Sequence, residues 1–120
     1  MRNPKWSKDE VILLVDLYGQ LMNQNKDLAD CPLQLQELSD LLRNHAIYNG
    51  HFVSDTFRNV TGLKMKCSNI TSIVEGSGLS HSSLLDRSVV EMLLSNPAEL
   101  HKKAEYIRRE WSDKIHHTTC

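Results

Sequence analysis

The stretch WSKDEVILLVDLYGQLM, Trp6 to Met22, decides the fold class, because it predicts a long helix that is buried on more than one side. Ser7 and Glu10 form a capping box, in which each side chain accepts a hydrogen bond from the other residue's backbone amide. Two apolar stripes then follow the helical period. They comprise Val11, Leu14, Val15, Tyr18 and Met22 in one stripe and Leu13, Leu17 and Leu21 in the other. Such a helix needs other helices packed around it.

Four further helices are predicted by the same signals. Pro32 suits a first helical position, either Ser54 or Asn59 caps a third helix, and Asn96 caps a fifth that begins at Pro97. The helices are expected at about 32–44, from 54 or 59 to 74, at about 84–95, and from 97 to about 115. Their apolar faces consist of Leu35, Leu38, Leu41 and Leu42, then Leu63, Cys67, Ile70 and Val74, then Leu85, Val89, Met92 and Leu93, and finally Leu100, Ala104, Ile107, Trp111 and Ile115.

The chain is therefore predicted to be all-α, a compact bundle of about five helices. We expect one helical domain over residues 1–115 and a frayed C-terminal tail over 116–120. The first three helices have the order of a helix-turn-helix-like unit. The connection at residues 44–55 is longer than the usual three or four residues, which counts against the strict motif.

Composition narrows the class of protein. With 40% hydrophobic and 24% charged residues, the chain is globular rather than disordered. No run approaches the ~20 apolar residues of a membrane span, and the start MRNPKW has no apolar region typical of a secretory signal. The three cysteines contain no CxxC pair, which favours reduced thiols. We therefore expect a cytoplasmic protein with no membrane partner.

Motifs for catalysis or metal binding are not found in the sequence. There is no phosphate-binding glycine loop, HExxH, GxSxG or Cys/His nucleophile signature. The six histidines do not pair at i, i+4 spacing, so surface histidine is favoured over a metal site. We expect no catalysis by this chain, no metal and no cofactor.

The segment FRNVTGLKMKCSNI, Phe57 to Ile70, is the unusual part of the sequence. From Thr56 to Val74 it carries Arg58, Lys64 and Lys66 without one acid, although the chain has a formal net charge of -1. Two interpretations are open at this point. The segment is either an ordinary solvated helix face or a surface that lies against the phosphates of double-stranded DNA.

The second interpretation gives a role to each polar residue of the third helix. Arg58, Lys64 and Lys66 would meet phosphates, Asn59 would cap the helix, and short polar side chains would read base edges or fix the register. The complete set of candidate DNA-binding residues is Arg58, Asn59, Thr61, Lys64, Lys66, Ser68, Asn69 and Thr71. Alternatives remain: Arg58 could bridge to Glu10 or Asp55, Asn69 could be buried, and Phe57 favours packing over base stacking.

The same residues carry a resemblance to a known family. The opening NPKW, the acid Glu10 and LxxxY from Leu14 to Tyr18 precede LSDLL at Leu38–Leu42. The pattern F-R-N-x-x-G-φ-x-x-K-φ-x-N-φ follows, where φ is apolar. It is formed by Phe57, Arg58, Asn59, Gly62, Leu63, Lys66, Cys67, Asn69 and Ile70. The last matching residues, later in the chain, are Gly78, Leu79, Leu100, Ala104 and Ile107. The chain resembles, over about Asn3 to Arg108, the helical N-terminal module of McrA-like HNH restriction endonucleases, which cut modified DNA.

The resemblance implies a recognition or accessory module of a modification-dependent restriction system. The HNH motif itself is missing, so such a module would not cut DNA alone and would work with a nuclease domain. Val60 stands where family members often have proline, and Cys67 and Ile70 replace a common leucine and aromatic. These departures keep the apolar character. The rival hypothesis is a protein-interaction or dimerisation head without DNA contact, with the Ile107, Trp111 and Ile115 stripe as its patch.

Overall fold

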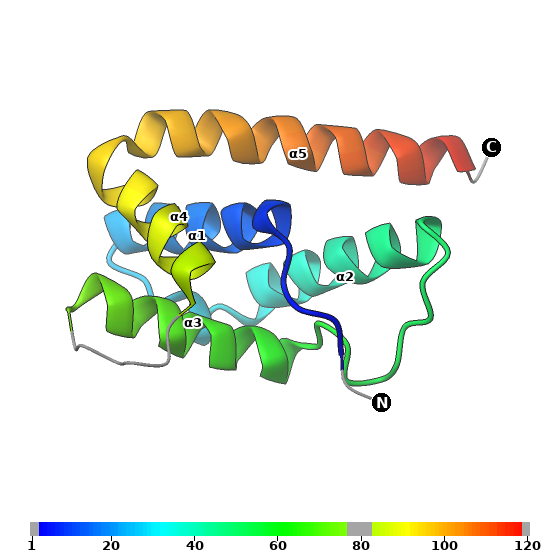
Figure 1. The fold of residues 1–120 in the computed structure, drawn as a ribbon, viewed down its shortest axis with the longest axis horizontal. Coiled ribbons are helices and arrows are strands. Elements are labelled where there is room, and N and C mark those ends of the chain that lie inside the picture. The colour runs from blue at the N-terminus through cyan, green and yellow to red at the C-terminus, as the bar shows by residue number, and fades with distance from the viewer. Residues whose placement is uncertain (1–2, 77–82, 119–120) are drawn as a thin grey trace.

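The computed structural model describes residues 3–76 and 83–118, and within these ranges every regular element is helical (Figure 1). The prediction of an all-α bundle is confirmed. The elements are α1 (Lys8–Asn23), the short 3-10 helix η1 (Leu28–Asp30), α2 (Pro32–Tyr48), α3 (Val60–Val74), α4 (Leu84–Ser95) and α5 (Pro97–Thr118).

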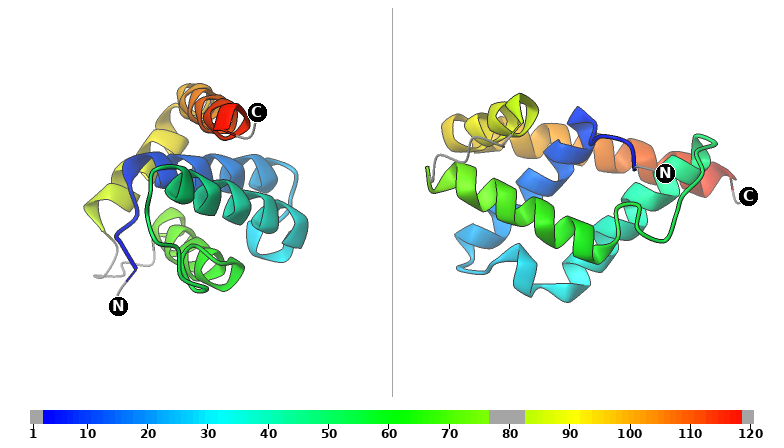
Figure 2. Two further views of the ribbon diagram at one scale, coloured as in Figure 1. Left: turned by 90° about the vertical axis from the view of Figure 1, so that its right-hand side faces the viewer. Right: turned by 60° about the horizontal axis from the view of Figure 1, so that its bottom comes forward.

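Helix α1 is the central element of the molecule. The residues from Val11 to Val15 are at most 3% exposed, so this helix is buried on all sides along that run. Helices α5 and α3 lie on opposite sides of the layer that contains α1 and α2 (Figure 2). At Gly19, α1 and α4 approach closely, since a Cβ there would lie 2.5 Å from Leu93 Cδ1. Because α1 is surrounded by other helices, its sequence has two apolar stripes and not one.

The first three helices do not form a separate helix-turn-helix unit. Helix α1 packs mainly against α5 and α4 rather than against α2 and α3. Residues 49–59 separate α2 from α3, which is far longer than the turn of that motif. The third helix is therefore held on the bundle by tertiary contacts and not by a tight turn.

Helix boundaries follow local signals at most ends. The capping box of α1 is present: the Ser7 amide donates to Glu10 Oε1 at 2.9 Å, and the Glu10 amide donates to Ser7 Oγ at 3.2 Å. Asn96 Oδ1 accepts from the Glu99 amide at 3.3 Å and caps α5. The glycine and serine content of EGSGLSHSS, residues 75–83, predicts a loop between α3 and α4, and most of it lies outside the described residues, which omit 77–82.

Two helices are longer than predicted. Helix α2 continues past residue 44 to Tyr48, because Ala46 is buried and extends the apolar face by one more turn. The pair Asn49-Gly50, which favours a turn with positive φ, follows directly, and Gly50 has a φ of +81°. Helix α5 runs to Thr118, so the tail expected from residue 116 is helical for most of its described part.

Candidate nucleic-acid interface

Helix α3 is fixed by its cap and by its inward face. Asn59 Oδ1 accepts a hydrogen bond from the Gly62 amide at 2.8 Å, as the sequence predicted. Leu63, Cys67 and Ile70 are at most 1% exposed. Burial raises the pKa of the Cys67 thiol to about 12, so this cysteine is a core residue and not a reactive one.

Arg58 is buried and serves the fold. Its Nε lies 2.8 Å from Glu10 Oε2, and its Nη2 lies 3.0 Å from Glu10 Oε1, so the pair is bidentate. The same Nη2 donates to the carbonyls of Pro4 and Lys5 at 3.0 and 3.1 Å. Its guanidinium carbon lies 4.7 Å from the centroid of the Trp6 ring. The structure thus shows the alternative role considered for Arg58, the bridge to Glu10, and leaves this side chain turned away from any phosphate.

The backbone around Arg58 is held in an unusual conformation. Its φ is +48°, which is uncommon for a residue other than glycine. Ser39 Oγ donates to the Arg58 carbonyl at 2.7 Å, and Arg43 Nη1 donates to the Phe57 carbonyl at 2.6 Å. Phe57 is 5% exposed and lies against the Arg58 guanidinium, so it packs in the core as expected. Helix α2 therefore positions the start of α3.

Lys66 is also turned inward. Its Nζ lies 2.8 Å from Asp86 Oδ2, and the two side chains are only 14% and 3% exposed. The same ammonium lies 5.3 Å from the centroid of the Trp6 ring. The pair ties α3 to the first turn of α4, where Ser83 Oγ accepts from the Asp86 amide. No local pattern predicts this contact, because the partners are 20 residues apart.

Thr71 belongs to the internal side as well. Its Oγ1 lies 3.0 Å from the hydroxyl of Tyr18, which is 53 residues away on α1. Of the eight candidate residues, Arg58, Asn59, Lys66 and Thr71 are therefore bonded within the bundle. This division could not be predicted from the helical period alone, since Lys66 lies at the edge of the inward face.

The outward face of α3 keeps the other four candidates together. Thr61, Lys64, Ser68 and Asn69 are exposed, and Met65 beside them is 67% exposed. Lys64 has no ion-pair partner within the part of the chain that the structure describes. Asn69 is exposed, so it is not the buried amide considered as an alternative. The outward face of α3 thus has one cation, several short hydrogen-bonding groups and no acid of its own, and Asp55 lies beside Thr61 at the start of the helix.

A second polar cluster joins α1 to α5. His101 Nδ1 lies 3.1 Å from Asp16 Oδ2, and Gln20 Nε2 donates to the same oxygen at 2.9 Å. Burial raises the pKa of Asp16, and the hydrogen bond with His101 opposes that shift. Across residues 3–76 and 83–118, no three metal-binding side chains converge. The cluster acts as a polar tie between the two helices.

Two of the three residues of the predicted α5 patch are buried, and the side chain of the third, Ile115, lies outside the described part of the structure. Ile107 and Trp111 are 7% and 6% exposed, and the Trp111 ring stacks on His45 with centroids 3.6 Å apart. Three exposed apolar side chains lie close in sequence at the C-terminal end of α2 and just after it. There Ile47, Tyr48 and Phe52 are 56%, 43% and 88% exposed. In the described helices, none has the length and apolar character that a membrane crossing would require.

Comparisons of the chain with protein-family models, with curated proteins and with solved structures found no match. The resemblance to McrA-like HNH endonucleases thus rests on the motif residues. Several of these residues have structural roles here. Glu10, Arg58, Asn59 and Lys66 cap, clamp or tie the start of α3, so the motif describes how this helix is attached to the bundle.

Proposed function

We propose that this chain is a DNA-binding recognition module of a modification-dependent, HNH-type restriction system, and that the exposed face of α3 contacts duplex DNA. The observation that carries the proposal is that Thr61, Lys64, Ser68 and Asn69 are exposed on a helix at the outside of the bundle that itself contains no acid. Acids would repel phosphate, and short polar side chains suit both phosphate oxygens and base edges.

The arrangement assigns different tasks to the four side chains. An α-helix fits the major groove of B-form DNA. Lys64 would contact a phosphate, and Thr61 would donate a hydrogen bond to a neighbouring one. Asn69 would bond an adenine edge, with Ser68 beside it. Arg58 and Lys66 act indirectly, because they hold the helix against α1 and α4.

The proposed module binds without cutting. The sequence contains no HNH motif, so cleavage would come from a nuclease domain that works with it. With one lysine on the contact face, binding of unmodified duplex is expected to be weak, near the ~10⁻⁴ M end of non-specific affinities. A preference for modified bases would add to this basal affinity.

The test is a salt series of fluorescence anisotropy with a labelled duplex. For one phosphate contact by Lys64, the slope of log K against log salt contains a contribution of about -0.9, which Lys64→Ala removes. A Ser68→Ala/Asn69→Ala variant is expected to lower affinity about tenfold without changing the slope. The matched control is Arg109→Ala, since Arg109 is exposed on α5, on the opposite side of the molecule from α3 (Figure 2).

Two results would refute the proposal. One is a folded chain that does not bind duplex DNA at low salt, with or without cytosine methylation. The other is an equal loss of binding for Arg109→Ala and Lys64→Ala, which would indicate attraction by overall charge and not by α3.

A second candidate function is supported by the exposed apolar group of Ile47, Tyr48 and Phe52. Apolar side chains that stand together on a surface mark protein contacts. In this case the module would dock onto the nuclease domain through the end of α2 and would not touch DNA. Titration of the HNH domain with wild-type chain and with Phe52→Ser distinguishes the two functions, because that substitution leaves the α3 face unchanged.

A further inference from the structure

A cleft lies between the first turn of α1 and the middle of α5. Its volume is about 530 Å³. The floor is apolar and consists of Ile12, Ile107 and Trp111, which are 3%, 7% and 6% exposed. Tyr106 stands at the rim and is 63% exposed, which leaves much of an aromatic ring in water. Tyrosine with an apolar body and a polar tip is a residue enriched in protein interfaces.

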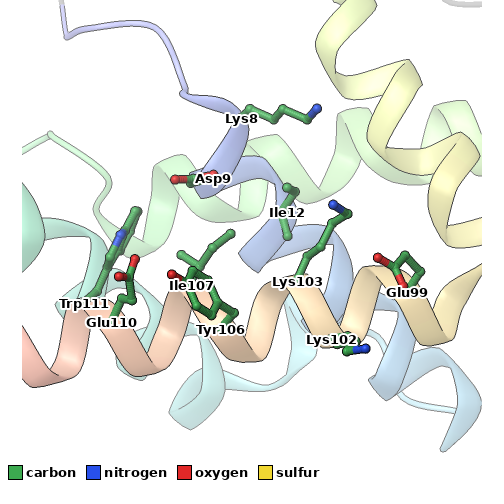
Figure 3. Close-up of a pocket in the computed structure, with 10 residues that line it drawn as sticks. All are labelled: Lys8, Asp9, Ile12, Glu99, Lys102, Lys103, Tyr106, Ile107, Glu110 and Trp111. Atoms are coloured by element: carbon green, nitrogen blue, oxygen red, sulfur yellow. The ribbon is translucent and has the colours of Figure 1, made fainter.

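Charges around this cleft are separated into two corners (Figure 3). Lys8 and Lys103 point into the space above the floor toward the start of α5, whereas Asp9 and Glu110 lie toward its end. No ion pair joins these four side chains to a partner within the described part of the chain. Glu99 and Lys102 also line the cleft toward the start of α5, so this corner holds three lysines and one acid, whereas Asp9 and Glu110 are the lining charges toward the end of α5. We call these two regions the basic corner and the acidic corner.

The sequence of α5 makes this pattern complementary to itself. Lys103 and Glu110 lie at equal distances, each about 5 Å along the axis at 1.5 Å per residue, from a point between Tyr106 and Ile107. Two such helices side by side in opposite directions would place each lysine opposite a glutamate.

We infer that a second copy of this chain occupies the cleft, through antiparallel pairing of the two α5 helices about a twofold axis near Tyr106. Lys103 of each copy pairs with Glu110 of the other, as an isologous interface requires. In the same way, Lys8 in the basic corner of one copy faces Asp9 in the acidic corner of the other copy. The two Tyr106 rings cover the apolar floors beside the axis.

Such a dimer leaves the proposed DNA contact free. Helix α3 lies on the side of the molecule opposite α5, so pairing through α5 keeps both α3 faces exposed (Figure 2). The inference does not rest on DNA binding, and each can fail while the other holds.

The experiment is sedimentation velocity of the purified chain over a concentration series up to millimolar. Wild type is expected to show a monomer–dimer equilibrium that weakens with salt. Lys103→Glu and Glu110→Lys each bring like charges together twice in a homodimer, so each raises the dimer Kd at least about tenfold. Circular dichroism confirms that both variants remain folded, since both side chains are exposed.

An equimolar mixture of the two variants is the decisive part of the experiment. One copy then carries two acids and the other two lysines at positions 103 and 110, so both contacts are restored and a heterodimer is expected with near wild-type affinity. Lys64→Glu on α3 is the control and leaves the dimer unchanged. A wild-type chain that stays monomeric at the highest concentration overturns the inference. So does a dimer that survives both single reversals, or a mixture that fails to associate.

Discussion

At the scale of single residues, Arg58 holds together three segments that are distant in sequence. It bonds the carboxylate of Glu10 at the start of α1, the carbonyls of Pro4 and Lys5, and through its own carbonyl the hydroxyl of Ser39 on α2. Both charges of the ion pair are largely shielded from water, with side chains 4% and 12% exposed. A buried pair of this kind is costly to break, because the remaining charge keeps its desolvation penalty.

The three basic residues of this segment are therefore expected to differ sharply in their effect on stability. Arg58→Ala leaves Glu10 without its counterion, and Lys66→Ala likewise leaves the buried Asp86 without its counterion. Each is expected to lower the free energy of unfolding by about 3 kcal/mol. Lys64→Ala is expected to stay within about 0.5 kcal/mol of wild type, because Lys64 is exposed and has no ion-pair partner among the described residues.

Urea unfolding followed by circular dichroism measures all three variants under one condition. Arg58→Lys is an informative companion, because a lysine cannot reproduce the bidentate contact with Glu10 and is expected to recover only part of the loss. Equal stability of Arg58→Ala and Lys64→Ala would contradict the structural role given to Arg58.

The residue scale also shows where prediction from sequence reached its limit. Which of the basic side chains face inward depends on acids 48 and 20 residues away, and no local pattern encodes those distances. The cap at Asn59 and the core positions Leu63 and Ile70 were predictable, because they depend on local hydrogen bonding and on helical period. The cap and the inward apolar face of α3 were thus predictable, and the division of its polar residues into exposed and internally bonded ones was not.

At the scale of elements, the end of α2 is joined to α5 by stacked rings. His45 lies parallel to Trp111, with an angle of 6° between the rings, and its Nε2 accepts from Asn49 Nδ2 at 3.0 Å. This contact explains why α2 runs farther than its leucine pattern predicts. In the sequence, Ala46 is the only sign that the apolar face of α2 continues past residue 44, and alanine is too small to give a strong periodic signal.

Acid is expected to weaken this junction. Burial lowers the pKa of His45 below its ordinary value of 6.5, with Lys114 adding to the effect and Glu10 opposing it. Because the folded pKa is lower than the unfolded one, the unfolded chain binds the proton more readily between the two values. The stability contributed by neutral His45 is therefore complete above pH 6.5 and is lost as the pH falls through the folded pKa.

The measurement compares urea unfolding of wild type and His45→Phe from about pH 7.5 to about pH 5.5, a range that spans the ordinary histidine pKa. The variant keeps a ring on Trp111 but cannot be protonated, so it is expected to lose less stability on acidification. His51→Phe is the control, since His51 is exposed in the following loop. Parallel losses in wild type and His45→Phe would rule out His45 as the source.

At the scale of the whole molecule, the segment before α1, residues 3–6, crosses from α1 to the start of α3. We call this segment the N-terminal arm. Asn3 exchanges hydrogen bonds with Ser54 and Thr56, and the carbonyls of Pro4 and Lys5 receive the Arg58 guanidinium. The arm thereby closes the bundle at the end where Glu10 and Arg58 are paired. The segment NPKW has no helical or strand pattern, so its role depends entirely on this tertiary contact.

Removal of the first five residues is expected to lower the free energy of unfolding by about 2 kcal/mol, because Arg58 loses two charge-assisted hydrogen bonds. The helical signal of circular dichroism should remain, since no helix begins before Lys8. Asn3→Ala in the full chain is the control and is expected to stay within about 0.5 kcal/mol of wild type. A truncated chain with wild-type stability would show that the contacts of the arm do not contribute to the free energy of unfolding.

The pairing of Glu10 with Arg58 has an evolutionary consequence. A substitution at either position alone leaves one charge stranded, so a lineage that abandons the pair must change both residues almost together or pass through an unstable intermediate. Relatives without an acid at the position of Glu10 are therefore expected to have lost the arginine of F-R-N as well. The pair therefore constrains positions 10 and 58 together, whereas the outward residues of α3, which take no part in it, can change independently.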